Sequence, residues 1–281
     1  MFEKIKDKYK NTEYKMLIAK IIDKYNICVT KNKITYTDFL NSTERTIVKN
    51  IFNEEKIYNY IFFGGNEEND RSILILYPYK MDLTMVKKNY DKILSVIRIN
   101  LPKSITYEHR DFLSGIMKLG IRREKFGDII ITDFGADIIV LNEICDTLIN
   151  DLKLLTRFKK SGITKCSINN VSNKIQEFQN TSIIVSSLRL DNFVAELTNV
   201  SRSKAIEIIN DGRVYLNYVI EYKSDKKLNE KDIINIRGKW KFVFDSIKRE
   251  TKNNKLNILI KKYIWFLFSK LEIIYIILIE L

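Results

Sequence analysis

The chain has 281 residues, 45% of them hydrophobic, which is long enough and apolar enough for two or three small domains with their own cores. Its formal charge of +13 and isoelectric point near 9.4 indicate an anionic partner. The cysteines Cys28, Cys145 and Cys166 lack Cys-x-x-Cys spacing, which argues against a disulfide framework and a zinc site.

The first 70 residues are predicted to form a helical region followed by a hairpin. Apolar side chains recur with helical spacing over 14–25 and again over 42–53, where Ser42 can cap the second helix. Residues 35–40, between these helices, have no clear periodicity, so we interpret the region as a helical packing unit. Strands at 57–63 and 72–77 flank the turn-rich segment that begins at Gly64-Gly65.

Residues 71–180 are predicted to form an α+β domain and its linker. The expected order is a strand at 93–99, a helix at 107–119, strands at 128–132 and 136–141, a helix at 143–154 and a strand near 163–168. This order indicates a ferredoxin-like, RRM-like arrangement of helices on an antiparallel sheet. The segment 157–180 is polar, and its later half is interpreted as the connection to the next domain.

A compact module is predicted between residues 188 and 246. One helix covers 190–197, and a second starts after Ser201 and ends before Gly212, which suits a left-handed cap. Arg202 and Lys204 fall in the first turn of the second helix, where the backbone already attracts phosphate.

Short strands are predicted beyond Gly212, at 214–217 and 233–236, followed by a basic and apolar run at 237–244. If this run were one strand, its basic side chains would lie on one face and its aromatic ones on the other. The basic face would comprise Arg237, Lys239 and Lys241, and the aromatic face Trp240, Phe242 and Phe244.

The positive charge is concentrated in and just before this module. Residues 152–262 contain 23 basic and 11 acidic side chains, which is +12 of the total of +13. A charge confined to one region indicates a binding surface for a polyanion more strongly than an evenly spread charge would.

The module resembles the alpha-L RNA-binding motif of small-subunit ribosomal protein four, the S-four domain. The similar pieces are Arg189-Leu190-Asp191, Ser201-Arg202-Ser203-Lys204-Ala205, Gly212-Arg213-Val214, Asn217, and Asp232-Ile233-Ile234 before Arg237-Gly238. Tyr218 departs from the small residue that the family often has there.

The resemblance implies that the second helix and the adjoining loop contact structured RNA, with phosphate-binding roles for Arg189, Arg202, Lys204 and Arg213. Asp191 is expected to orient an arginine, and Asn217 could instead hold its turn. The expected RNA-binding set is Arg189, Ser201, Arg202, Ser203, Lys204, Arg213, Asn217, Arg237, Lys239 and Lys241. We expect these cations on one face and without acidic partners; the alternative for each is a solvated surface charge.

The stretch from His109 to Ile129, with Gly135-Ala136-Asp137 and Glu143-Ile144, is similar to the central domain of the YlmH family. That family carries its S-four domain at the C-terminus, and the resemblance spans roughly residues 10–262. It implies RNA binding on the large ribosomal subunit in rescue of stalled translation, and a link to cell division. Arg122, Arg123 and Lys125 form a basic loop that is either a secondary RNA contact or an exposed loop neutralised by nearby acids.

The segment 264–281 departs from the YlmH pattern because it is mostly apolar over eighteen residues. Lys270 and Glu272 interrupt it, and a charge at the bilayer centre costs about 2.5–3.5 kcal/mol. We therefore expect a peripheral helix or strand, or an accidental extension of the reading frame, rather than a membrane anchor. The domain boundaries that follow are 1–70, 71–180, 181–262 and 263–281.

The sequence contains no nucleophile with a paired base, no metal-ligand cluster and no dinucleotide-binding glycine motif. We therefore expect a non-catalytic, cytoplasmic, ribosome-associated protein that binds ribosomal RNA and tRNA, without a metal, cofactor or small-molecule substrate. The alternatives are an RNA-modifying enzyme of the pseudouridine synthase or methyltransferase type, and a membrane-associated division factor.

Overall fold

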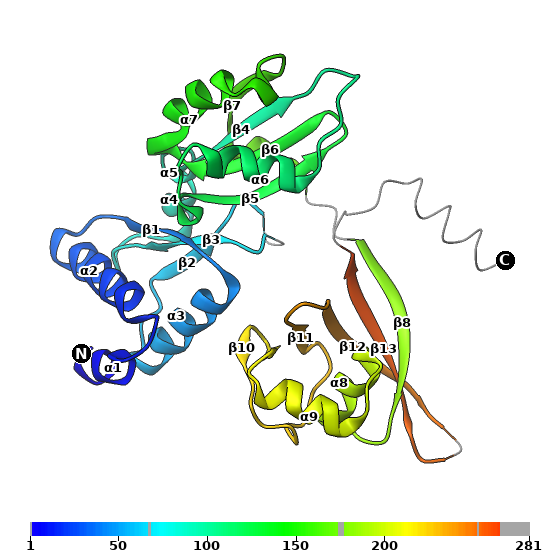
Figure 1. Cartoon of the computed structure of the whole chain (residues 1–281). Coiled ribbons are helices and arrows are strands. Elements are labelled where there is room, and N and C mark those ends of the chain that lie inside the picture. Colours follow the sequence, from blue (N-terminus) through cyan, green and yellow to red (C-terminus); the bar gives the residue numbers. More distant parts are fainter. Residues whose placement is uncertain (1, 67–68, 174–176, 252, 265–281) are drawn as a thin grey trace. The chain divides into compact units, whose positions relative to one another are not determined.

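The computed structural model describes residues 2–66, 69–173, 177–251 and 253–264. The chain divides into two compact units, Met1–Lys174 and Ile175–Leu281 (Figure 1).

The first unit begins with a helical layer on a small antiparallel sheet in the strand order β1-β3-β2. The predicted hairpin is confirmed by the antiparallel pairing of β2 with β3. The elements are α1 (Glu3–Tyr9), α2 (Lys15–Lys31), β1 (Thr35–Leu40), α3 (Ser42–Glu54), β2 (Tyr60–Phe63) and β3 (Ser72–Leu76).

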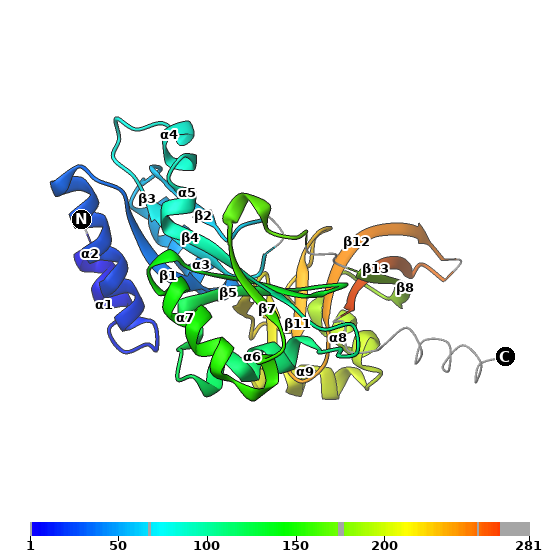
Figure 2. The ribbon, with the colours of Figure 1, turned by 90° about the horizontal axis from the view of Figure 1, so that it is seen from above.

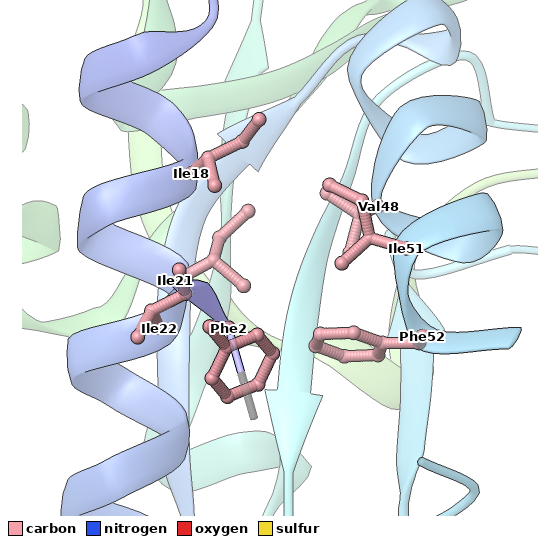
Figure 3. Close-up of a pocket in the computed structure, with 7 residues that line it drawn as sticks. All are labelled: Phe2, Ile18, Ile21, Ile22, Val48, Ile51 and Phe52. Carbon is pink, nitrogen blue, oxygen red and sulfur yellow. The ribbon is translucent and has the colours of Figure 1, made fainter. Parts of the chain in front are cut away.

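The helices of this layer enclose an apolar core that Phe2 completes (Figure 3). The Phe2 ring meets the Tyr25 ring edge-on, with ring centroids 5.4 Å apart. A cavity of about 10 Å³ remains between α2 and α3, lined only by apolar side chains. This volume is at the lower limit for one water molecule, so the core is densely packed.

The interpretation of this region as purely helical is wrong, because residues 35–40 form strand β1. Its side chains are buried on both faces: Leu40 packs into the helical core, and Phe39 packs into the core on the other side of the sheet. A strand buried on both faces need not alternate between apolar and polar residues, so no period of two was visible.

The second half of the unit is the predicted ferredoxin-like domain, and its fold is confirmed. All its strand pairs are antiparallel, and the sheet order β5-β6-β4-β7 places the first and third strands of the β-α-β-β-α-β series at the centre. The elements are β4 (Leu94–Asn100), α6 (His109–Lys118), β5 (Phe126–Thr132), β6 (Gly135–Leu141), α7 (Asn142–Leu154) and β7 (Gly162–Ser167). Two short helices that were not predicted precede β4: α4 (Leu83–Lys87) and α5 (Tyr90–Ile93).

The two faces of this sheet pack against different partners. Helices α6 and α7 cover one face (Figure 2), where Ile97 and Ile138 meet Phe112 and Leu148. The other face carries Leu94, Val96, Ile139 and Leu141, which share a core with Phe39, Ile73 and Ile75 of the three-stranded sheet. The two sheets of the first unit are therefore joined through a common apolar layer.

The second unit is a sheet in the order β10-β9-β11-β12-β13-β8, with α8 (Leu190–Thr198) and α9 (Arg202–Asn210) packed on one face. Both helices match their predicted positions. The strands are β8 (Glu177–Val185), β9 (Val214–Leu216), β10 (Val219–Ile220), β11 (Ile233–Ile236), β12 (Lys241–Glu250) and β13 (Leu256–Ile264).

Two predictions about these strands are corrected. The run 237–244 is not one strand, because residues 237–240 form the turn between β11 and β12, with Gly238 at φ +77°. The segment up to residue 180, interpreted as a connection, contains the start of β8, which pairs along its whole length with β13. These strands lie about 75 positions apart in the chain, so no local pattern indicated the pairing.

Candidate nucleic-acid interface

Helix α9 begins at Arg202 because Ser201 caps it. The Ser201 hydroxyl accepts a hydrogen bond from the backbone N–H of Lys204 at 3.3 Å, and it lies 3.0 Å from the Ser203 hydroxyl. Arg202 and Lys204 therefore lie in the first turn of the helix, as predicted, beside the positive end of its dipole.

The preceding helix supplies an acid that holds two arginines. Asp191, in the first turn of α8, is fully buried. Its carboxylate accepts hydrogen bonds from Arg189 Nε and Nη2 at 3.2 and 2.9 Å, and from Arg202 Nε and Nη2 at 3.1 and 2.9 Å. The side chains of Arg189 and Arg202 stay 39% and 54% exposed, so both guanidinium groups reach solvent. We call these three residues the arginine clamp.

The charge state of the clamp follows from two opposing effects on Asp191. Burial raises the pKa of this carboxyl group, but the hydrogen bonds and positive charges of Arg189 and Arg202 outweigh burial, and the pKa lies below its ordinary value. The carboxylate is therefore ionised at neutral pH, and the clamp has a net charge of +1. Each guanidinium group also retains N–H groups that Asp191 does not use.

The expectation that the cations lack acidic partners is wrong for the first turn of α9. Arg189 and Arg202 share Asp191, and Lys204 Nζ lies 2.5 Å from Glu207 Oε2 on the same helix. The Lys204 and Glu207 side chains are each 61% exposed, and a pair this exposed contributes only about 0–1 kcal/mol. A phosphate can therefore compete with Glu207 for Lys204 at little cost.

A second group of cations lies beyond the other end of α9. The backbone N–H of Arg237 donates to the Arg213 carbonyl at 2.8 Å, and Arg213 Nη2 donates to the Arg237 carbonyl at 3.4 Å. Both residues and the neighbouring Lys239 are exposed. The positive charge of Arg213 also acts on Lys204, opposing the upward shift in pKa that Glu207 causes. The charge of Arg213 is therefore felt at the first turn of α9 as well as beside Arg237.

The side chain of Asn217 is used inside the module. Asn217 and Tyr218 both have positive φ, 49° and 69°, in the tight turn between β9 and β10. The Asn217 amide donates to Asp232 Oδ1 at 2.8 Å and accepts from the backbone N–H of Ile233 at 2.9 Å. This geometry favours the turn-holding role over an RNA contact.

Lys241 does not share an exposed basic face with Arg237 and Lys239. It is only 8% exposed, and its ammonium group lies 4.3 Å from the ring centroid of Tyr263 and 4.9 Å from that of Tyr218. The expected three-residue face is wrong because β12 begins at Lys241, after a turn that contains the other two cations. Lys241 is held by cation–π contacts instead.

The basic loop of the first unit is mostly engaged within the protein. Arg123 Nη1 donates to the carbonyls of Phe126 and Gly127 at 2.7 and 3.0 Å, and burial lowers the pKa of Arg123 to about 10. Lys125 Nζ lies 2.7 Å from Asp38 Oδ1. Arg122 is 65% exposed and lies 3.2 Å from Glu124, so it is the most accessible cation of the three.

The ferredoxin-like sheet does not present an open platform for bases. RNA-binding sheets of this type stack bases on exposed aromatic side chains of the face opposite the helices. Here one end of that face is buried against the three-stranded sheet. At the other end Asp137 is fully buried, and Arg98 binds it through Nε and Nη2 at 2.8 and 2.7 Å.

The first unit also contains a groove of about 640 Å³ between α2, β1 and the start of α7. Charges of both signs line this groove, including Lys24, Asp38 and Glu143. Within the described residues, no cluster of three or more His, Cys, Asp or Glu side chains is arranged to hold a metal ion.

The apolar tail predicted at 264–281 lies outside the described residues from position 265 onward. In the part of the chain that the structure describes, no helix has both the length and the apolar character needed to cross a bilayer.

Several cations of the second unit were not singled out from the sequence. Lys231 and Lys261 both bind Asp245, at 2.7 and 2.9 Å, and their hydrogen bonds lower the pKa of Asp245 to about 2. Lys262 lies 3.8 Å from the ring centroid of Trp240. Both Lys261 and Lys262 belong to β13. Because this strand was not predicted, the sequence did not indicate that the two lysines lie beside the other cations of the module.

Comparison with known proteins gives the same two parts. Residues 87–170 match the domain family described as "Putative RNA-binding domain in YlmH", and residues 188–234 match the S4 domain. A Bacillus subtilis (strain 168) protein named ribosome-associated protein quality control protein P2 is 25% identical over 228 residues, which are 80% of this chain and 86% of that protein. A solved structure, the cell division protein ylmH from Streptococcus pneumoniae, is 17% identical and covers 58% of this chain and 96% of its own, with a TM-score of 0.43.

Two helices on a small sheet, with cations at the start of α9, define an RNA-binding protein with a C-terminal S4 domain. The chain thus contains a domain similar to the RNA-binding domain of YlmH followed by an S4 domain, and its similarity to the Bacillus subtilis relative extends over 80% of the chain.

Proposed function

We propose that this protein binds ribosomal RNA and tRNA on the large ribosomal subunit and acts in the rescue or quality control of stalled translation without catalysing a reaction. The observation that carries the proposal is the arginine clamp beside the capped start of α9. The name of the Bacillus subtilis relative supports the ribosomal setting. On this proposal the protein works in the cytoplasm, on ribosomes.

The clamp suits folded RNA because it presents rigid cations at fixed positions. A buried carboxylate that binds two guanidinium groups removes much of their rotational freedom before RNA arrives, so less entropy is lost on binding. Guanidinium N–H groups match phosphate oxygens geometrically. The N–H groups of the first turn of α9 add a second phosphate-binding element beside them.

Phosphate contacts predict a strong dependence of affinity on salt. Each phosphate contact adds about −0.7 to −0.9 to the slope of log K against log salt concentration. If Arg189, Arg202, Lys204 and Arg213 each contact one phosphate, the slope is roughly −3 to −4. An affinity for the large subunit that stays constant between low and physiological salt contradicts the proposal.

The test is co-sedimentation with large ribosomal subunits. Arg202→Gln combined with Lys204→Gln removes two positive charges without placing a new carboxylate against Asp191, and we expect the affinity to fall by roughly tenfold or more. The control is Lys49→Gln with Lys118→Gln, which removes the same charge from exposed helix positions of the first unit. Equal sedimentation of the two variants, with circular dichroism unchanged, overturns the assignment of the site.

A further inference from the structure

We propose that the second unit has another RNA-binding surface, on the sheet face opposite α8 and α9, which takes unpaired nucleotides. This inference rests on the proposed function, because it assumes that RNA is the ligand of the protein. We call the surface the outer face. It is formed by Lys241, Val243, Asp245, Ser246, Lys248 and Arg249 of β12, by Asn257, Leu259, Lys261 and Tyr263 of β13, and by Phe178, Asn180, Ser182 and Ile184 of β8.

The strand register separates this surface from the core. Ile258 and Ile260 of β13 are fully buried and pack in the core that Phe193 of α8 and Ile209 of α9 complete. Successive side chains of a strand point to opposite faces, so Leu259 and its alternate neighbours lie on the outer face. Among the described residues of this unit, the helices cover only the inner face, and β8 and β13 extend beyond them (Figure 1).

An aromatic pair occupies the end of the outer face. Phe178 and Tyr263 are directly paired across β8 and β13, and their ring centroids lie 4.9 Å apart in an edge-on arrangement. Phe178 is 38% exposed, so part of its side chain is accessible to a ligand. The Lys241 ammonium group lies 4.3 Å from the Tyr263 ring centroid, so Tyr263 is fixed between the lysine and Phe178. Phe178 is therefore a positioned, accessible ring on which a base can stack.

The charges of the outer face favour RNA over protein as its ligand. Among its described residues, the outer face has four basic side chains, Lys241, Lys248, Lys261 and Arg249, and one acidic side chain, Asp245. Asp245 binds Lys231 and Lys261, which leaves the surface with a net positive charge. Lys248 reaches across β13 to the Ser182 hydroxyl at 3.1 Å, so one cation lies over the middle of the face.

The spacing of these groups along the β-strands fits single-stranded RNA. Along a strand, alternate residues are about 6.6–6.8 Å apart, which is close to the distance between successive phosphates of an extended nucleotide chain. The pairing partners of Phe178 and Ser182 on β13, Tyr263 and Leu259, are two such steps apart. A strand of RNA that stacks a base on Phe178 can thus bring a backbone phosphate close to Lys248. Duplex RNA, except at a terminal base pair, cannot offer a base face to Phe178 without unpairing.

The test measures binding of the full chain to fluorescein-labelled decauridylate, an unstructured RNA. We expect Phe178→Leu to weaken binding by roughly tenfold, because it removes the ring but keeps an apolar side chain. We expect Phe178→Tyr to bind as the unmodified chain does. The oligonucleotide should quench the tryptophan emission of Phe178→Trp more than that of the unmodified chain, which already contains Trp240 and Trp265. A structural role alone does not produce this additional quenching. A twofold or smaller effect of Phe178→Leu, or no additional quenching in Phe178→Trp, overturns the proposal.

Two further measurements separate this proposal from its alternatives. Deca-glutamate that displaces decauridylate at equal concentration would mean that the outer face binds acidic protein segments, and the RNA assignment would be overturned. Arg202→Gln with Lys204→Gln removes phosphate-binding charge and should lower decauridylate affinity less than Phe178→Leu does, whereas Phe178→Leu should keep most of the affinity for large subunits. If the proposed function is wrong, Arg202→Gln with Lys204→Gln will sediment with large subunits as the unmodified chain does. If this inference is wrong, Phe178→Leu will bind decauridylate as the unmodified chain does.

Discussion

Arg202 donates two hydrogen bonds, at 3.1 and 2.9 Å, to the buried carboxylate of Asp191, although the two residues belong to different helices. Arg189 binds the same carboxylate from the residue that precedes α8. The acid thus joins the starts of both helices and positions two cations at the same place. Without it, the two arginines would repel one another and move independently.

This arrangement predicts an unusual result for Asp191→Asn. The substitution raises the net charge by one, which by itself would strengthen binding to a polyanion. We expect the opposite, weaker binding to large subunits, because an amide cannot accept charged hydrogen bonds from two guanidinium groups as well as a carboxylate does. Stability should fall by about 1–3 kcal/mol, a range that allows for the partial exposure of both arginines.

The matched control is Glu196→Gln, which removes one negative charge from an exposed position of α8. Its affinity for large subunits should be equal to or slightly higher than that of the unmodified chain. If Asp191→Asn behaved like this control, net charge alone would govern binding and the clamp would have no role in positioning.

Asp191 also predicts a loss of stability in acid. Its folded-state pKa lies below its unfolded value, so its contribution is fully present above the unfolded pKa and disappears as pH falls through the folded pKa. We expect the urea midpoint of the second unit to fall as the pH is lowered from about 5, and Asp191→Asn to reduce that fall. Both tryptophans, Trp240 and Trp265, follow residue 175, so tryptophan emission reports on this unit. An acid dependence identical in both proteins would show that Asp191 is not the group that titrates.

The sequence was sufficient to predict the ferredoxin-like domain because its local patterns agree with its tertiary structure. Strands β4 to β7 and helices α6 and α7 each lie close to their predicted ranges, and short connections fix the order of the elements. Strand β1 was missed because it is buried on both faces, as Phe39 and Leu40 show. Strand β8 and its partner β13 were both missed because the two pairing segments are remote from one another in the chain.

The residues of the candidate interface were easier to name than their partners. The first turn of α9 followed from the Ser201 cap, so Arg202 and Lys204 were correctly placed. The bond between Arg202 and Asp191 depends on how α8 packs on α9, which no local pattern specifies. Lys241 was assigned to an exposed face because residues 237–240 were taken as a strand rather than a turn.

The contact between the two sheets of the first unit can be tested at Gly127. A Cβ atom at this position would lie 2.6 Å from Cε1 of Phe39, a ring that is 1% exposed. We expect Gly127→Ala to destabilise the first unit by about 1–3 kcal/mol, because the buried ring cannot move aside freely. The measurement is chemical unfolding followed by circular dichroism, with hydrogen exchange of β1 and β5 to locate the effect.

Gly162→Ala is the matched control, since its new Cβ would lie an ordinary 3.8 Å from Asn100 Cβ. It should change stability by less than about 0.5 kcal/mol. Phe39→Leu should offset part of the cost of Gly127→Ala when the two are combined, because a smaller side chain leaves room for the new methyl group. If the two changes in the free energy of unfolding simply add in the double variant, residues 39 and 127 do not interact sterically.

Arg122 and Arg123 are neighbours in the basic loop, and we expect their substitutions to have different effects. Arg123 donates to the carbonyls of Phe126 and Gly127, and its guanidinium carbon lies 4.4 Å from the Phe126 ring centroid. Arg123→Ala should therefore destabilise the first unit by about 1–3 kcal/mol, since it leaves two carbonyls without these donors. Arg122→Ala should change stability by less than about 0.5 kcal/mol, because its pair with Glu124 is exposed.

The same two variants test whether the loop contacts RNA. If Arg122 binds a phosphate, Arg122→Ala should weaken binding to large subunits and reduce the salt slope by about 0.7–0.9, with unfolding unchanged. If the loop does not contact RNA, Arg122→Ala should bind as the unmodified chain does. Because Arg123 is engaged by the backbone, any loss of binding in Arg123→Ala should disappear under conditions that restore full folding. A direct binding defect in folded Arg123→Ala would mean that this arginine leaves its internal partners when RNA binds.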